Sequence, residues 1–394
     1  MEEMAEPIDV QEPTRYRIMV FSWNTESVGL CETMDKSVAD SNRSGFFTFW
    51  RYPCDIPDFY PKFSEFITEH IPDIVVIGFQ EDRFPGSYFH SHLLPEEMPK
   101  LGYGLIKRTK LMGVGVTTYK GALQGDLFER GLRLSLYAKK ELISVIEKEE
   151  GEMRVAIGND GQDEYVCSSF VTRGKGAAVS YLMLPGFGRL AFICCHLPFN
   201  ARSLITERLY KNRMLRQNEV NQSNICFNSI IESLVLFKNP SPTHVIYFGD
   251  FNYRLADYRP ASKVADDFTN KGGDKEFIHD MYEEYDELKE QMRRKNIYEF
   301  NEGISNQGPT FVPTCKMVKG RATESYSDQI PETGDCWKTG KQNQRVPSWC
   351  DRILYAKFGD DSHNLICTYY NRFDVGEVMS KSDHAGVLSM FELV

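Results

Sequence analysis

Several short apolar runs in this chain end abruptly in polar residues, and this pattern constrains the fold more than any other feature. Residues 73–79 (DIVVIGF) are almost entirely apolar and lead into a polar stretch that contains Glu81. Residues 245–248 (VIYF) likewise lead through a glycine into Asp250. Continuous apolar runs of this length are typical of strands covered on both faces. The pattern therefore predicts an α/β protein in which layers of structure cover the strands.

Polar residues also stand beside four further strand-like runs, so six apolar runs in the chain have polar residues at one end. The additional polar residues are Asn24, His196, Asp351 and the pair Asp383-His384. In layered α/β folds, functional sites gather where strand ends meet. Carboxylate and amide oxygens suit Mg²⁺, and two histidines among carboxylates suit acid–base chemistry on a phosphate.

Each of these residues also has an ordinary structural interpretation. Asp250 after Gly249 could form an Asx turn, and Asn24 and Glu81 could lie in loops. His196 could be a packed histidine at a strand end. Asp351 could pair with Arg352, and Asp383-His384 could form an Asx turn or a helix cap. The occurrence of six such ends in one chain favours a shared site.

Asp250 and Asn252 are two residues apart. In an extended chain they would point to the same side, where they could orient one water and one phosphoryl oxygen together.

Two segments in the second half of the chain have the sequence pattern of helices. Residues 204–237 read as one long helical stretch with an expected break around 221–224. Residues 276–295 read as a single charged amphipathic helix.

The length and charge of the chain limit the classes of function. The chain has 394 residues, a formal net charge of −10 and a pI of about 5.4. A protein that coats nucleic acid would normally be basic. An acidic chain that binds polyanions needs a local basic pocket, or divalent cations, to supply positive charge.

Cysteine usage and the distribution of apolar residues indicate a reducing setting and no membrane span. None of the ten cysteines forms a CxxC pair, which favours reduced, buried thiols in a cytoplasmic protein. No apolar run reaches the ~18 residues that a spanning helix needs. Residues 1–15 are acidic and contain proline, so we expect a flexible lead-in to a single domain over residues 16–394.

Two longer motifs identify a family resemblance. Residues 249–255 read GDFNYRL and residues 345–354 read RVPSWCDRIL. Both resemble signatures of the inositol polyphosphate 5-phosphatases, within the DNase I-like superfamily of endonucleases, exonucleases and phosphatases. Shorter matches are SWN at 22–24, GFQE at 78–81, KGA at 175–177, CHL at 195–197 and SDH at 382–384.

The resemblance implies a fold, a metal ion and a mechanism. The implied fold is a four-layer α/β sandwich, in which two mostly antiparallel sheets pack face to face between helices. The implied cofactor is Mg²⁺, held by Glu81 and Asn24. The implied reaction is in-line attack by water on the 5-phosphate of an inositol ring, without a phospho-enzyme. The implied catalytic residues are Asp250, Asn252, His384, Asp351, His196 and Asp383.

Substrate contacts are implied for a second group of residues: Lys175, Lys316, Arg345, Arg352, Tyr253 and Arg254. The alternative for the lysines in long polar segments is a solvated loop. The stretch PTCKM at 313–317 departs from the TYKY-like stretch of family members that recognise a 4-phosphate. Phosphoinositide headgroups and soluble inositol phosphates both remain candidate substrates.

Two rival functions remain at this stage. One is an Mg²⁺-dependent DNA endonuclease of the same superfamily, which the acidic charge and the PSWCDR run disfavour. The other is a catalytically silent phosphoinositide-binding module, which predicts missing catalytic residues. We expect a cytoplasmic monomer that binds no nucleic acid. Any peripheral contact with membranes would come from exposed aromatic residues and lysines near the mouth of the site, and the alternative role of those aromatic residues, which we favour, is the buried core. Residues 46–50 and 103–111 are the candidates for that contact.

Overall fold

A computed structural model gives the architecture of most of the chain. It describes residues 15–25, 59–84, 93–116, 127–148, 154–156, 175–198, 209–236, 241–257, 259, 261–315, 317, 346–359, 362–373 and 382–394. Most of the predicted N-terminal segment and the membrane-contact candidate at 46–50 lie outside these residues, as do Lys316 and Arg345.

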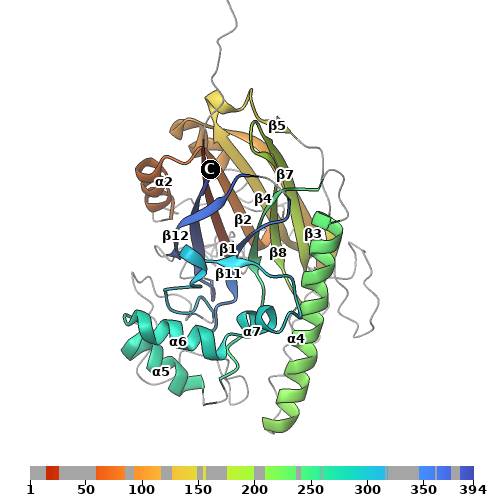
Figure 1. Cartoon of the computed structure of the whole chain (residues 1–394), viewed down its shortest axis with the longest axis vertical. Coiled ribbons are helices and arrows are strands. Elements are labelled where there is room, and N and C mark those ends of the chain that lie inside the picture. The colour runs from red at the N-terminus through yellow and green to blue at the C-terminus, as the bar shows by residue number, and fades with distance from the viewer. Residues whose placement is uncertain are drawn as a thin grey trace, which may run out of the picture.

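The first sheet has the strand order β12-β13-β1-β2-β4-β3 (Figure 1). Its central strands β1 (Tyr16–Asn24) and β2 (Ile74–Phe84) run parallel, and the other pairings in the sheet are antiparallel. The remaining strands are β3 (Tyr103–Val116), β4 (Leu127–Lys139), β12 (Leu365–Phe373) and β13 (Gly386–Leu393).

The second sheet has the strand order β10-β11-β9-β8-β7-β5, and β6 also pairs with β7. Here β8 (Gly188–His196) and β9 (His244–Asp250) form the parallel pair, and the other pairings are antiparallel. The remaining strands are β5 (Glu147–Lys148), β6 (Arg154–Ala156), β7 (Gly176–Leu184), β10 (Asn301–Glu302) and β11 (Asp351–Lys357).

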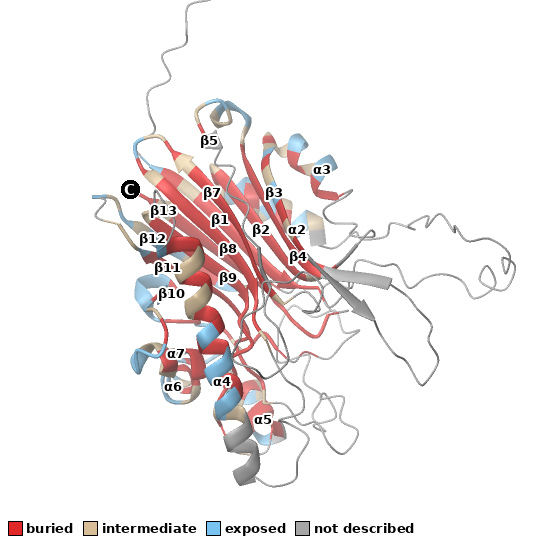
Figure 2. Ribbon diagram, turned by 90° about the vertical axis from the view of Figure 1, so that its right-hand side faces the viewer, coloured by how far each residue is buried: buried red, intermediate tan, exposed pale blue. Residues whose placement is uncertain are grey.

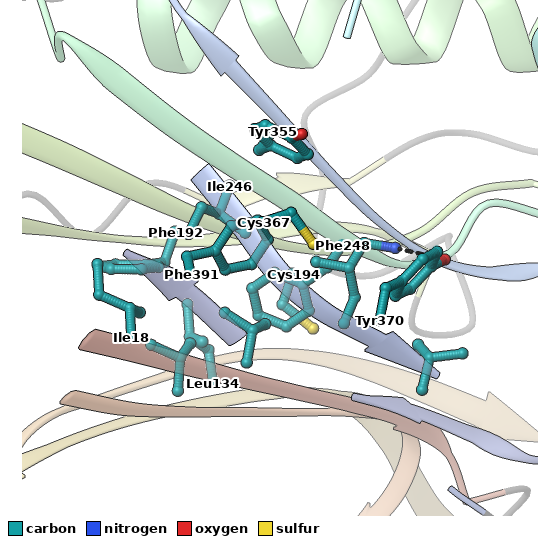
Figure 3. Close-up of a cluster of buried hydrophobic side chains, with 14 of the residues drawn as sticks. Ile18, Leu134, Phe192, Cys194, Ile246, Phe248, Tyr355, Cys367, Tyr370 and Phe391 are labelled. Atoms are coloured by element: carbon teal, nitrogen blue, oxygen red, sulfur yellow. Dashed lines mark hydrogen bonds between the residues drawn. The ribbon is translucent and has the colours of Figure 1, made fainter. Parts of the chain in front are cut away.

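The inner faces of the two sheets share one apolar core. Figure 3 shows Ile18 and Leu134 of the first sheet beneath Phe192 and Ile246 of the second. These side chains are essentially inaccessible to solvent. Their burial, at roughly 25 cal/mol per Å² of apolar surface, is the main contribution that holds the sheets together.

Helices cover the outer faces of both sheets. Helix α2 (Phe59–His70) packs Phe63 and Ile67 against the first sheet, and α4 (Leu209–Ile231) packs Phe227 and Ile230 against the second. Figure 2 shows α2 and α4 on opposite sides of the buried strands. The predicted α/β sandwich is therefore confirmed. Because each sheet has a helix layer on one face and the other sheet on its opposite face, central strands such as β8 and β9 are buried along almost their whole length.

The other helical elements are short. They are α3 (Leu94–Glu97), α5 (Ala261–Lys271), α6 (Lys275–Tyr285), α7 (Glu287–Arg293), the 3₁₀ turns at Met98–Leu101, Lys140–Leu142 and Ile304–Asn306, and a π-helical turn at Glu232–Leu236 that follows α4. None of the helices in the described part of the chain is long and apolar enough to cross a membrane.

Two predictions about helices were wrong. Helix α4 runs without a break through residues 221–224. The Asn224 side chain bonds to Gln291 and Tyr253, so it does not compete for the backbone of its own helix. The expected single helix at 276–295 is instead two helices separated by Asp286, which has an extended backbone and caps α7 by accepting from the Lys289 N–H at 2.9 Å.

Candidate active site

Strand register brings four of the predicted polar ends together. In the second sheet, His196 pairs with Asp250 across the parallel strands, and Asp250 pairs with Asp351 across β9 and β11. Asn24 ends β1 of the first sheet, and its Nδ2 donates to Asp250 Oδ2 at 2.9 Å. The candidate site therefore lies where the ends of the two sheets meet.

The backbone departs from regular strand geometry at two predicted site residues. Glu81 has a φ of 54° and lies where the β2–β4 register shifts between Phe79 and Asp82. Asn252 has a φ of 58°. Positive φ is costly for residues other than glycine, and bulges commonly redirect a side chain beside an active site. Both features direct a polar side chain out of the strand pattern.

Asp250 is held as an ionised carboxylate although it is buried. Its Oδ2 accepts from Asn24 and lies 3.3 Å from His196 Nε2, and its Oδ1 accepts from the Asn252 N–H at 2.9 Å. Burial by itself would raise the pKa of Asp250. The hydrogen bond with His196, together with the charges of His384 and Lys175, instead lowers that pKa below its usual range.

Asn252 reaches the site by a turn. The bond between its backbone N–H and the Asp250 carboxylate is the Asx turn that the sequence left open. The expectation that Asp250 and Asn252 share one side of an extended chain was therefore wrong. The Asn252 amide donates to the Leu197 carbonyl at 3.0 Å, and its Oδ1 accepts from Arg254 at 3.1 Å.

His384 belongs to a chain of hydrogen bonds with Asp351 and Thr314. Its Nδ1 lies 2.8 Å from Asp351 Oδ2, which also accepts from the Thr314 hydroxyl at 2.8 Å. Burial opposes the cation, but Asp351, followed by Cys315, raises the pKa of His384 well above its ordinary value. Burial raises the pKa of Asp351 to about 6, although His384 opposes this shift. This arrangement keeps His384 cationic at neutral pH.

His196 is shifted in the opposite direction. Its Nε2 lies between the Asp250 carboxylate and the Lys175 ammonium, and Glu81 Oε1 is 3.8 Å away. Burial and then the Lys175 charge lower the pKa of His196, although Asp250 opposes them. The site thus contains one neutral and one cationic histidine, the kind of pair that divides acid and base roles in enzymes.

The donor set suits a hard divalent cation at Glu81 and Asn24. The Glu81 carboxylate is partly exposed beside Asp250 and His196, and Asn24 uses its amide nitrogen toward Asp250, which leaves the oxygen as its ligand atom. Possible ligand atoms of Asp250, Asp351 and His384 also lie within 4.8 Å of one another. Because His384 Nδ1 is bonded to Asp351, this second group fits proton transfer better than metal ligation.

Arg352 and Tyr253 are not positioned for substrate contact, and those two predictions were wrong. The Arg352 side chain is completely buried and pairs with Asp286 at 2.9 Å and with Glu302. Tyr253 is also buried and donates to Asn224 at 2.8 Å. These two motif residues therefore bond to other buried residues in the interior of the protein.

The other predicted residues stand in different relations to the site. Asp383 Oδ1 lies 3.5 Å from His384 Nε2, and Lys175 contacts His196. Arg254 is buried and contacts Asn252, so it can position that side chain. In the membrane-contact candidate at 103–111, Tyr103 is buried and donates to the Pro72 carbonyl.

Three supporting residues were not predicted as site residues. Thr314 bonds Asp351, Trp23 Nε1 donates to the His384 carbonyl at 3.0 Å, and Ser382 donates to the Asn24 carbonyl at 2.7 Å. Trp23 and Ser382 lie within motifs that carry the family resemblance, and Thr314 lies in the stretch at 313–317 that departs from the TYKY-like stretch of the family. That location is the only signal in the sequence that could have identified them.

Comparison with known proteins places this arrangement in a family. A family model described as endonuclease/exonuclease/phosphatase family 2 matches residues 21–390. The chain belongs to this family. The resemblance predicted from the motifs is confirmed, because the curated relatives that match the chain include inositol polyphosphate 5-phosphatases.

One such family relative is phosphatidylinositol 3,4,5-trisphosphate 5-phosphatase 2A of Danio rerio. It is 26% identical over 251 residues, which are 64% of this chain and 17% of the relative. The chain thus spans less than a fifth of the length of that protein.

Solved structures agree on the fold of this family member. The inositol polyphosphate 5-phosphatase domain of SPsynaptojanin, in complex with inositol (1,4)-bisphosphate and calcium ion, has a TM-score of 0.56 and 22% identity. The match covers 96% of this chain and 84% of that domain. A nitrophorin from Cimex has a TM-score of 0.58 and 15% identity, with 97% and 99% coverage. Because one fold is common to a phosphatase domain and a nitrophorin in complex with NO, function must be inferred from the site.

Proposed function

We propose that this protein is an Mg²⁺-dependent hydrolase that removes the 5-phosphate of an inositol ring by direct attack of water. Its candidate substrates are phosphoinositides such as PI(4,5)P2 and PI(3,4,5)P3 and soluble inositol polyphosphates. The observation that carries the proposal is the buried, ionised Asp250, held between Asn24, His196 and the Asn252 backbone and close to a cationic His384.

Asp250 and His384 divide the work of phosphoester hydrolysis. Asp250 remains ionised, so it can accept a hydrogen bond from water and orient it for attack, and then take its proton. His384 is cationic and can donate to a phosphoryl oxygen as negative charge develops there. Asp351 fixes the ring of His384 through Nδ1, so Nε2, which lies beside Asp383 and Cys315, is the nitrogen that would donate to the substrate.

Asn252, His196 and Asp383 complete the phosphate contacts in this proposal. The left-handed turn at Asn252 presents its amide beside Asp250, and Arg254 holds its oxygen. His196 contributes from the opposite side with Lys175. Asp383 lies beside His384 Nε2 and belongs to the hydrogen-bond network around metal and water.

Glu81 and Asn24 are the residues that would hold Mg²⁺. When bound, Mg²⁺ would neutralise charge on the phosphoryl group and lower the barrier to its transfer. The partly exposed carboxylate of Glu81 is consistent with a site that keeps several waters.

The substrate class is supported by the motifs and by the names of the relatives. The phosphatidylinositol trisphosphate 5-phosphatase of Danio rerio and the synaptojanin domain are both named as 5-phosphatases of phosphorylated inositols, and the latter is bound to inositol (1,4)-bisphosphate, which lacks a 5-phosphate. Lys175 contacts His196 at the site. Lys316 and Arg345 lie outside the described residues, so their contacts with phosphate stay predictions. We also propose that the protein acts in the cytoplasm as a monomer that binds the phosphorylated inositol.

A phosphate-release panel with Mg²⁺ tests the proposal. It compares lipid vesicles with soluble inositol phosphates, each with and without a 4-phosphate, and includes supercoiled plasmid as a substrate for nicking. Release from a 5-phosphorylated inositol without nicking supports the proposal. Plasmid nicking without phosphate release would establish the nuclease alternative.

Asp250→Asn is the matched blank for this panel. It preserves the size of the side chain but removes the charge that orients water, so activity should fall by roughly 10²–10⁴-fold. A thermal unfolding curve near that of the wild type shows that the variant folds. Full activity in a folded Asp250→Asn protein would refute the assignment.

Glu81→Gln tests the metal assignment separately. The neutral amide is a weaker Mg²⁺ ligand than the carboxylate. We expect the Mg²⁺ concentration for half-maximal activity to rise, and Mg²⁺ binding measured by calorimetry without substrate to weaken. If neither the Mg²⁺ concentration for half-maximal activity nor the calorimetric Mg²⁺ affinity changed, Glu81 would not be a metal ligand.

A further inference from the structure

Two buried cysteines adjoin the candidate active site without a role in the proposed hydrolysis. Cys315 lies between two segments of the site: its backbone N–H donates to the Ser348 carbonyl at 3.1 Å, and it forms a bridge with His384. Cys350 immediately precedes Asp351 and is also fully buried. Cys350 lies two residues beyond Ser348, which pairs with Cys315, and its Sγ donates to the Tyr253 carbonyl at 3.5 Å.

The environment of Cys315 is electropositive. Arg254 donates to Cys315 Sγ at 3.2 Å, and His384 Nε2 lies 3.6 Å from the same sulfur. The Arg254 guanidinium also donates to the amide oxygen of Asn252. A buried guanidinium is stabilised by a neighbouring anion, and a thiolate at Cys315 supplies one.

The two thiols are shifted in opposite directions. Although burial would raise it, the neighbouring Cys350 thiol and the charges of His384 and Arg254 lower the pKa of the Cys315 thiol well below its ordinary value. Burial raises the pKa of Cys350 well above its ordinary value. The pair therefore consists of a thiolate beside Arg254 and His384 and a neighbouring protonated thiol.

Other buried cysteines in the described part of the chain lack this combination. Burial raises the pKa of Cys194 to about 12 and that of Cys367 to about 11. Their sulfurs contact the Gln80 amide and the Ser389 hydroxyl, which are neutral groups. These cysteines are internal references, because they are equally buried but not paired with cations.

We propose that Cys315 is a peroxide-reactive modification site and that Cys350 is its resolving thiol. The thiolate beside Arg254 and His384 is the nucleophile, and a hydroperoxide is the oxidant. The contact with His384 places the sulfur at the candidate catalytic centre.

The chemistry balances with hydrogen peroxide as the oxidant. The Cys315 thiolate attacks one peroxide oxygen, the O–O bond breaks, and the hydroxide that leaves takes a proton from the site to become water. Cys350 then attacks the Cys315 sulfenic acid, an S–S bond forms, and a second water leaves. Two thiols are oxidised by two electrons, and one peroxide is reduced to two waters.

The consequence for catalysis rests on the proposed function. Oxidation removes the negative charge that Cys315 places beside His384, and this charge raises the pKa of that histidine. It also removes the acceptor of Arg254, which holds Asn252. Oxidised protein should therefore lose hydrolytic activity, and a thiol reductant should restore it.

The test uses the reduced full-length chain, hydrogen peroxide and the sulfenic-acid probe dimedone, with peptide mass spectrometry as the readout. Cys315 should react at least about tenfold faster than Cys194 or Cys367, because the thiolate is the reactive form. Without dimedone, a Cys315–Cys350 disulfide should accumulate and disappear on reduction. In Cys350→Ser, the dimedone adduct on Cys315 should accumulate, whereas Cys367→Ser should behave as the wild type.

Two results would overturn the proposal. One is a Cys315 peptide that oxidises no faster than the Cys367 peptide in the wild-type chain, a comparison that needs no variant to fold. The other is a disulfide from Cys315 to a cysteine other than Cys350. Neither readout uses substrate turnover, so either result is distinguishable from a failure of the proposed hydrolase activity.

Discussion

At the scale of single residues, the candidate site separates two histidines by their surroundings. His196 is buried beside the Lys175 ammonium, so its neutral form is favoured. His384 is equally buried but bonds to Asp351, so its cation is favoured. The same side chain therefore serves two roles, and the difference comes from one neighbouring charge of opposite sign in each case.

Asp351→Asn should lower the upper pH limit of activity. The fold raises the pKa of His384, so the stabilisation of its cation is complete below the ordinary value of 6.5 and is lost as pH rises through the higher folded value. Without the carboxylate, that loss should occur at lower pH. Profiles of kcat/KM against pH on an inositol bisphosphate measure the shift. An unchanged alkaline limb would mean that His384 is not the acid, and Asp351→Glu is the charge-preserving control.

Thr314→Val should reduce activity without unfolding the protein. Valine has a similar shape but cannot donate to Asp351 Oδ2, so the Asp351–His384 pair should lose orientation. We expect kcat to fall by roughly 10-fold, in the range seen when outer partners of a site are removed. Thr314→Ser retains the hydroxyl and should recover most of the loss. Equal loss in the serine and valine variants would point to packing instead.

At the scale of elements, the end of β9 is shaped by its close approach to β8. Gly249 has a φ of 136°, and an added Cβ would lie 2.0 Å from the Cys195 carbonyl oxygen. Because Gly249 has no Cβ, β9 can lie this close to β8 immediately before Asp250, the site residue. At the end of β2, the bulge at Glu81 redirects a site side chain.

Gly249→Ala should destabilise the protein by ~3 kcal/mol or more, since it combines backbone strain with a clash against backbone that cannot move aside. Gly273→Ala is the control, because nothing lies within 4 Å of a Cβ added in the turn between α5 and α6. Urea unfolding of both variants measures the difference. Similar midpoints for the two variants would contradict the role given to Gly249.

At the scale of the whole molecule, a buried ion network ties the second sheet to its helices. Arg352 of β11 bonds Asp286, at the junction of α6 and α7, and Glu302 of β10. Tyr282 and Tyr370 bond the same Glu302 carboxylate. The arginine of the PSWCDR motif is thus an internal cation that joins segments distant in sequence.

Arg352→Met should destabilise the protein by about 3–5 kcal/mol, because it leaves two buried carboxylates without their cation. Arg293→Ala, which breaks an exposed pair with Glu290, should cost at most about 1 kcal/mol. Denaturant unfolding measures both. If the folded Arg352→Met protein instead kept its stability and showed a raised KM, Arg352 would be a substrate contact after all.

The sequence by itself determined the strands, the family and most of the site residues. Apolar runs such as 73–79 identify strands because burial on both faces leaves a local pattern, and motif residues such as Asp250 and His384 are readable in order along the chain.

Only the tertiary structure decided which motif residues face the site and what charge they carry. Arg352 and Arg254 look alike in sequence, yet one pairs with interior carboxylates and the other with Asn252 and Cys315. Asn24 bonds to Asp250, which is 226 residues away in the sequence. The single helix expected at 276–295 is divided at Asp286, whose carboxylate binds Arg352. Desolvation and pairing with distant segments set these outcomes, and neither leaves a local pattern in the sequence.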